Sequence, residues 1–168
     1  MKKIFKKIQG QKICPTSKYG FTLIEILVVI GIIAILATVV LIAINPSRQF
    51  KLARDSQRTA NVVSILNALG QNISENRGVF TCNGVAFAFP SLPTVIKSGT
   101  GSSSEADVAP CLVPIYLASL PFDPSAAGAY YTSTSSYNTG YSLSQDSGGR
   151  LTVSAIAEIG STTISVSR

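Results

Sequence analysis

The chain has 168 residues and a formal net charge of +6, with 46% hydrophobic and only 13% charged residues. Soluble globular domains carry roughly 25% charged residues, so this composition is unusual for one. The absence of histidine from the sequence excludes His-based catalytic triads, histidine general bases and most zinc sites. The length allows one modest domain and an additional segment.

The excess positive charge lies in the first 20 residues. This leader contains Lys2, Lys3, Lys6, Lys7, Lys12 and Lys18 and no acidic residue, whereas residues 21–168 carry eight basic and eight acidic residues. A basic stretch directly before an apolar segment stays on the cytoplasmic side of a membrane. We therefore expect the leader to orient a membrane segment, and we predict no specific nucleic-acid partner.

Residues 21–44 form an apolar run with a single charged side chain, Glu25. A membrane-spanning helix needs about 20 apolar residues, so the run is long enough. It is too long for the roughly 7–15-residue core of a cleaved secretory signal. A carboxylate inside a membrane normally has a partner. Because no lysine or arginine lies between Phe21 and Ser47, we expect that partner from the chain end or another chain, unless the carboxyl group stays protonated.

The junction between leader and apolar run reads Gly20-Phe21-Thr22-Leu23-Ile24-Glu25. With the lysine-rich leader and the spanning length, it resembles the class III signal of type IV prepilins and type II secretion pseudopilins. The resemblance implies cleavage between Gly20 and Phe21 by a prepilin peptidase and N-methylation of Phe21. It also implies that Glu25 guides assembly by pairing with the Phe21 amine of a neighbouring subunit.

The same resemblance implies the partners and the location. The partners are copies of the chain in a filament, the membrane aspartyl prepilin peptidase, the inner-membrane pilus or secretion assembly platform, and membrane lipid. The precursor is expected to cross the cytoplasmic membrane once with its leader inside, and then to enter an extracellular or periplasmic filament. No cofactor is implied.

The predicted fold class is α+β, a long N-terminal helix packed on a small antiparallel head. The expected segments are a cleaved leader (1–20), a transmembrane and filament-core helix (21–45), an amphipathic continuation (46–75) and an extracytoplasmic head (76–168).

Pro46 is the expected helix break. It cannot donate a hydrogen bond to the carbonyl of Ile42, and its ring clashes with that turn. The alternatives are a kink or a new helix with Asn45 as N-cap and Pro46 in its first turn. We expect a kinked, nearly continuous helix, although the usual family proline lies about one turn earlier.

The amphipathic continuation has two kinds of side chain. Apolar residues at helical spacing predict a face packed under the head; they are Val62, Leu66, Leu69 and Ile73. The charged residues of the early turns are Arg48, Lys51, Arg54, Asp55 and Arg58. We expect this cluster to be a solvated or intersubunit face near the membrane, with contact to lipid phosphates or DNA as the alternative.

Cys82 and Cys111 are predicted to form a disulfide. Both would lie outside the cytoplasm, where disulfides persist. Cys14 lies in the leader, so cleavage would leave an even pair. Two free thiols are the alternative.

The C-terminal region predicts an antiparallel sheet with strands at 129–133, 140–145, 150–157 and 162–167. Asp146-Ser147-Gly148-Gly149 is a hairpin signal. Four tyrosines, Tyr130, Tyr131, Tyr137 and Tyr141, are expected to pack within the strands, with a sticky aromatic surface as the alternative.

No metal or catalytic site is predicted. Asp123 lies in the turn Leu120-Pro121-Phe122-Asp123-Pro124, and no second carboxylate follows nearby. Calcium needs about six to eight oxygen ligands, so we expect Asp123 to cap the turn. No activated nucleophile or phosphate-binding motif appears, and we expect the chain to be a substrate of enzymes and not itself an enzyme.

Three functions are compatible with these sequence features. The first is a pilus-like filament subunit, which the absence of an acidic calcium loop favours over a type II secretion pseudopilin. The second is a signal-anchored extracytoplasmic binding protein that never polymerises. The third is nucleic-acid binding through the basic residues, which predicts an affinity that falls steeply with salt.

Overall fold

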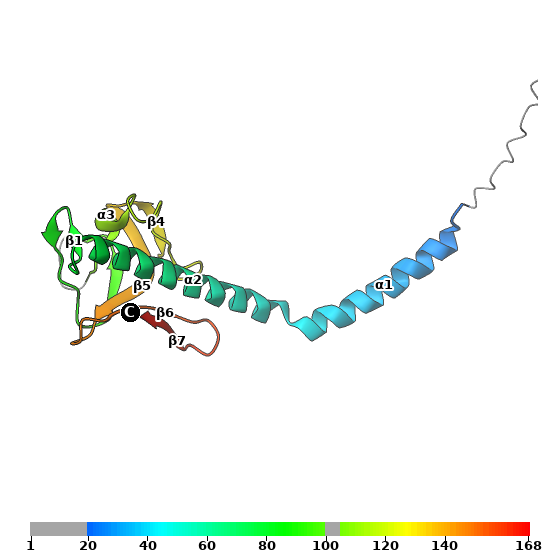
Figure 1. Cartoon of the computed structure of the whole chain (residues 1–168). Coiled ribbons are helices and arrows are strands. Elements are labelled where there is room, and N and C mark those ends of the chain that lie inside the picture. Colours follow the sequence, from blue (N-terminus) through cyan, green and yellow to red (C-terminus); the bar gives the residue numbers. More distant parts are fainter. Residues whose placement is uncertain (1–19, 100–104) are drawn as a thin grey trace, which may run out of the picture. The chain divides into compact units, whose positions relative to one another are not determined.

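The computed structural model describes residues 20–99 and 105–168 (Figure 1). Apart from Gly20, the expected leader therefore lies outside the described residues. The chain divides between Ile44 and Asn45 into two compact units, which are described separately below. The helices are α1 (Leu23–Ile44), α2 (Pro46–Glu75) and α3 (Ala109–Leu112). The strands are β1 (Thr81–Cys82), β2 (Val85–Ala86), β3 (Thr94–Lys97), β4 (Tyr130–Ser133), β5 (Ser136–Gln145), β6 (Leu151–Ile156) and β7 (Thr163–Ser167).

Helix α1 has no buried residue. Its 22 residues have a mean hydropathy of 3.3 in the most apolar window, which is long and apolar enough for a membrane crossing. A helix that is apolar on all sides needs a surrounding of lipid or of other apolar helices. The described residues of the first unit do not bury any part of α1, so the helix needs such a surrounding.

The helical region is interrupted at one residue. Asn45 adopts the left-handed conformation with φ of 47°, and its side-chain oxygen accepts a hydrogen bond from the Arg48 amide at 3.4 Å. Pro46 is the first residue of α2, a position where its missing N–H costs nothing. Helix α2 thus begins as the new helix with an asparagine cap, one of the two expected alternatives, and Asn45 alone separates it from the end of α1.

Helix α2 covers one face of the sheet with an apolar stripe. Val62, Leu66 and Leu69 are buried as expected, Ile73 is partly buried, and Ile65 is an additional fully buried member. The stripe contacts β6 and β7. Opposite it lie alternate residues of the sheet, including Tyr141, Leu143, Leu151, Val153 and Ala155. The alternation follows from the two-residue period of a strand.

The main sheet has the order β3-β5-β6-β7, with β4 also paired to β5. All of its strand pairs are antiparallel. The four strands expected from the sequence are present, although β5 begins at Ser136, four residues before the expected start. An α+β architecture is thereby confirmed.

The disulfide between Cys82 and Cys111 is confirmed. It joins β1 to α3 across a sequence separation of 29 residues. Closing a loop of this length stabilises the fold by about 3.5 kcal/mol in the chain-entropy model. The disulfide fixes the segment that follows α2. The two strands of this segment, β1 and β2, are only two residues long each.

Candidate functional site

The expected cleavage junction is fully accessible. Gly20 and its neighbour Phe21 are exposed, and 82% of the surface of Phe21 is accessible. A β-carbon added at Gly20 would meet no atom within 4 Å. The fold of the described chain therefore does not require glycine at this position, and any such requirement has to come from a partner that binds the junction.

Glu25 has a local partner that the sequence analysis missed. The Glu25 carboxylate accepts hydrogen bonds from the Thr22 amide at 3.2 Å and the Thr22 hydroxyl at 3.1 Å. In return, the Glu25 amide donates to the Thr22 hydroxyl at 3.3 Å. This reciprocal arrangement is a capping box, and its signature of threonine followed three residues later by glutamate was visible in the sequence.

The capping box satisfies backbone groups at the start of α1, but it does not neutralise the charge of Glu25. Both of its donors are neutral groups of Thr22. That a neutralising partner comes from the chain end or another chain therefore stays a prediction. A cationic partner remains compatible with the geometry, because the side chains of this turn are exposed.

A second polar site lies in the head, where Arg58 on α2 is only 3% exposed. Its guanidinium makes a bidentate contact with Asp123, with Nε to Oδ2 at 2.6 Å and Nη2 to Oδ1 at 2.9 Å. It also contacts Asp55 at 2.7 Å and Glu158 at 3.1 Å. Three carboxylates from α2, the turn before β4 and the loop after β6 thus converge on one arginine.

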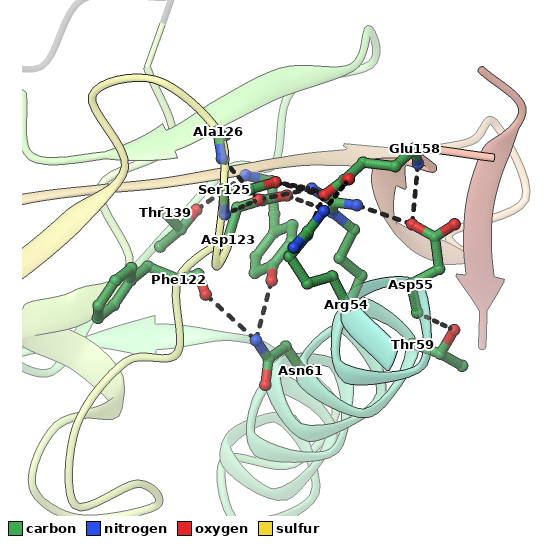
Figure 2. A network of polar contacts seen from close by, with 12 residues as sticks. Arg54, Asp55, Thr59, Asn61, Phe122, Asp123, Ser125, Ala126, Thr139 and Glu158 are labelled. Carbon is green, nitrogen blue, oxygen red and sulfur yellow. Dashed lines mark hydrogen bonds and ion pairs between the residues drawn. The ribbon is translucent and has the colours of Figure 1, made fainter. Parts of the chain in front are cut away.

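Further contacts hold this cluster together. Figure 2 shows the network, with Arg54, Asp55, Asp123 and Glu158 labelled. Arg54 makes two contacts of 2.6 Å with Glu158. The Asp55 carboxylate accepts hydrogen bonds from the amides of Glu158 and Ile159. We call Arg54, Asp55, Arg58, Asp123 and Glu158 the arginine clamp.

Each carboxyl group of the clamp is held in its ionised form. For Asp123, burial opposes ionisation, yet hydrogen bonds from Arg58 and from the amides of Ser125 and Ala126 outweigh it and lower the pKa. The amide of Glu158 is the main cause that lowers the pKa of Asp55. Arg54, followed by Ser125, lowers the pKa of Glu158 to about 2.

The expectation of a solvated basic face was wrong for Arg58, which is buried. Arg54 is partly shielded by Glu158, whereas Arg48 and Lys51 are exposed and line an open pocket of about 300 Å³. The expected capping role of Asp123 is confirmed, because it accepts the Ser125 and Ala126 amides at 2.9 and 2.8 Å. Its pairing with Arg58 was missed, since 65 residues separate the two.

The tyrosines divide between core and surface. Tyr137 and Tyr141 are buried, while Tyr130 is 44% exposed and Tyr131 is half-buried. The Tyr137 hydroxyl accepts from the amides of Val108 and Ala109 and donates to Asp107. The Tyr141 hydroxyl accepts a bond of 2.9 Å from Asn61 on α2. Packing within the strands, as expected, therefore holds for the two buried tyrosines.

Within residues 20–99 and 105–168, no group of three or more histidine, cysteine, aspartate or glutamate residues is arranged to hold a metal ion.

Comparison with known proteins gives one match. A family described as "Prokaryotic N-terminal methylation motif" matches residues 16–41. No match is found among curated proteins or among solved structures. The matched segment spans the end of the leader, the Gly20–Phe21 junction and most of α1.

The motif and the apolar helix that contains it fit the class III signal of a type IV prepilin or pseudopilin. They also fit a precursor anchored in a membrane by α1. The resemblance stated from the sequence is confirmed at this level. The match ends at residue 41 and does not reach the head, which begins after α2.

Proposed function

We propose that this protein is a structural subunit of a type IV pilus-like filament, made as a membrane-anchored precursor and not an enzyme. A prepilin peptidase cleaves it between Gly20 and Phe21, the new Phe21 amine is methylated, and α1 enters the core of the filament. The methylation motif at residues 16–41 is the observation that carries the proposal.

The physical properties of α1 support an assembly role. Its side chains are exposed along the whole helix, so extraction from lipid requires another apolar environment. Packing against the same helix of other subunits provides one. Cleavage would also create a cationic amine four residues before Glu25, a charge that the neutral donors of Thr22 do not supply.

Charge pairing between subunits would set the axial register. An unpaired carboxylate in an apolar core is strongly disfavoured, and removal of one partner from a buried ion pair costs about 3–5 kcal/mol. A subunit that placed Glu25 opposite the Phe21 amine of its neighbour would avoid this penalty. Subunits shifted along the axis would not.

Mass spectrometry of the purified N-terminus tests the proposal. We expect a mature chain that starts at N-methylated Phe21, and a full-length precursor when Gly20 is replaced by a bulky residue. A β-carbon at Gly20 meets no atom of the described fold within 4 Å, so a block of Gly20→Leu would reflect peptidase recognition. An unprocessed Met1 terminus on the wild-type chain, in a host that has the peptidase, would instead identify a permanent signal anchor.

The type II secretion pseudopilin remains the second candidate, because the matched motif is shared by both classes. Imaging of sheared surface filaments, followed by peptide identification, separates the two. We expect this chain in surface filaments of wild-type cells. Its absence from such filaments, together with a secretion defect on deletion, would assign it to the secretion system.

A further inference from the structure

The edges of the main sheet are protected to different extents. The outer edge of β3 is covered, because its Val95 carbonyl accepts the Ala106 amide at 3.0 Å and Lys97 pairs with Glu105 at 2.8 Å. Strand β4 has four residues and an irregular register against β5. Strand β7 pairs with β6 in a regular register over five residues. Among the described residues, no segment pairs with the outer edge of β7.

The hydrogen bonds at both ends of β7 determine which backbone groups point outward. Leu151 and Arg168 exchange both backbone hydrogen bonds, and the Ala157 amide donates to the Thr162 carbonyl. Bonded and non-bonded pairs alternate in an antiparallel ladder. The amides and carbonyls of Thr163, Ser165 and Ser167 therefore point away from β6 and are free for another strand.

Natural proteins block exposed edges with lysine, proline, bulges or covering segments. Residues 159–167 contain no charged residue and no proline, and the register of β7 has no bulge. The side chains of Thr163, Ser165 and Ser167 are exposed, and Ile164 and Val166 on the opposite face are only half-buried. The edge therefore offers both free backbone groups and apolar surface that an added strand would cover.

We propose that the outer edge of β7 pairs antiparallel with β7 of a second copy of this chain, about a two-fold axis at Ser165. In this register Ser165 lies opposite Ser165, and Thr163 lies opposite Ser167. All three outward-pointing residues of each strand then form hydrogen-bonded pairs.

This register is also self-complementary in its side chains. Hydroxyl residues lie opposite hydroxyl residues on one face, a favourable cross-strand combination, while Ile164 lies opposite Val166 on the other. A shift by one residue would place apolar side chains on the hydroxyl face. A shift by two would lose one of the three pairs. The two copies of Arg168 would lie at opposite ends of the paired edges, so no like charges face each other.

The pairing has a consequence for assembly. A two-fold contact uses the same patch on both copies and closes after two subunits. It therefore cannot propagate a filament, and it would join precursors in the membrane or heads of separate filaments. Anchoring of both copies in one membrane would raise their effective concentration and favour a short interface.

Cysteine cross-linking of the full-length precursor in membranes tests the register, in a Cys14→Ser background. Paired Cα atoms lie about 5.5 Å apart in a hydrogen-bonded pair, within the range of a disulfide. We expect Ser165→Cys to give a disulfide dimer under mild oxidation. Thr163→Cys or Ser167→Cys alone should not, because four residues along a strand separate like positions by about 13 Å. Co-expression of these two variants should restore the dimer.

Charge substitution at the edge is the second arm of the test. Ser165→Lys places a charge at the two-fold axis and should abolish dimers detected by a lysine-independent cross-linker. Ser154→Lys is the matched control, because Ser154 lies opposite Ser165 but on the interior strand β6. Equal cross-linking of all three single cysteine variants would indicate random collision and overturn the proposal. So would the absence of any dimer, provided that peptide mapping shows an intact Cys82–Cys111 bond.

Discussion

Glu25 has two separable roles at the scale of single residues. Its hydrogen-bonding capacity is used inside the chain, where it caps α1 together with Thr22. Among the described residues, Glu25 forms no salt bridge. A glutamine can replace the glutamate in a capping box, so the two roles can be tested by different substitutions.

We predict that Glu25→Gln is processed at Gly20 but fails to form filaments, because it keeps the cap and loses the charge. Thr22→Val should weaken the helix start by about 0.5–2 kcal/mol, the typical value of an N-cap, and still assemble. Sheared-filament yield and N-terminal mass spectrometry measure both variants. Normal filaments from Glu25→Gln would show that assembly does not need the charge of Glu25.

The arginine clamp acts at the scale of elements, because it joins α2 to two segments that belong to no helix or strand. These are the turn around Asp123 and the loop that carries Glu158 between β6 and β7. Both side chains of the Arg58–Asp123 pair are at most 4% exposed. Loss of one partner would leave a buried charge without compensation.

We predict that Arg58→Met lowers the free energy of unfolding by about 3–5 kcal/mol, the usual cost of breaking a buried ion pair. Arg150→Met is the control, because Arg150 is 65% exposed and 3.8 Å from Asp146. It should change the stability by less than about 0.5 kcal/mol. Chemical denaturation of the detergent-solubilised chain, followed by circular dichroism, gives both values.

A double variant separates the charge from the contacts. Asp123→Asn removes the buried negative charge and keeps an oxygen for the amides of Ser125 and Ala126. Arg58→Met with Asp123→Asn should therefore be more stable than Arg58→Met alone. A double variant at least as unstable as the single one would show that burial of the charge is not the cause.

The same cluster makes the stability of the whole head depend on pH. Asp55, Asp123 and Glu158 all have a lowered pKa in the folded state. A carboxyl group with a lowered folded pKa contributes stability above its unfolded pKa, which is about 4. That contribution disappears as the pH falls through the folded pKa.

We predict that the thermal unfolding midpoint is constant from neutral pH to about pH 5 and falls steeply between about pH 4 and pH 2. The lower limit corresponds to the pKa of Glu158, about 2. Thermal melts followed by circular dichroism at several pH values test this. The Arg58→Met, Asp123→Asn variant should show a shallower fall, and an equally steep one would place the dependence elsewhere in the molecule.

Regular patterns made much of the fold predictable. Alternation of apolar and hydroxyl residues marks β6 and β7, and helical spacing of Val62, Leu66 and Leu69 located the core face of α2. Strands β1, β2 and β3 were not predicted, and the two residues in each of β1 and β2 are too few to display a period. Their positions depend on the disulfide and on pairing with β5.

The sequence by itself determined the basic leader, the apolar helix that follows it, the capping signature at Thr22 and Glu25, and the two cysteines of the head. These features are local, since neighbouring residues create them. Only the tertiary structure decided that Arg58 is buried between Asp123 and Glu158, because 65 and 100 residues separate it from them. It also decided that β7 is an open edge among the described residues, because an edge is defined by the strand order of a sheet and not by the composition of any single strand.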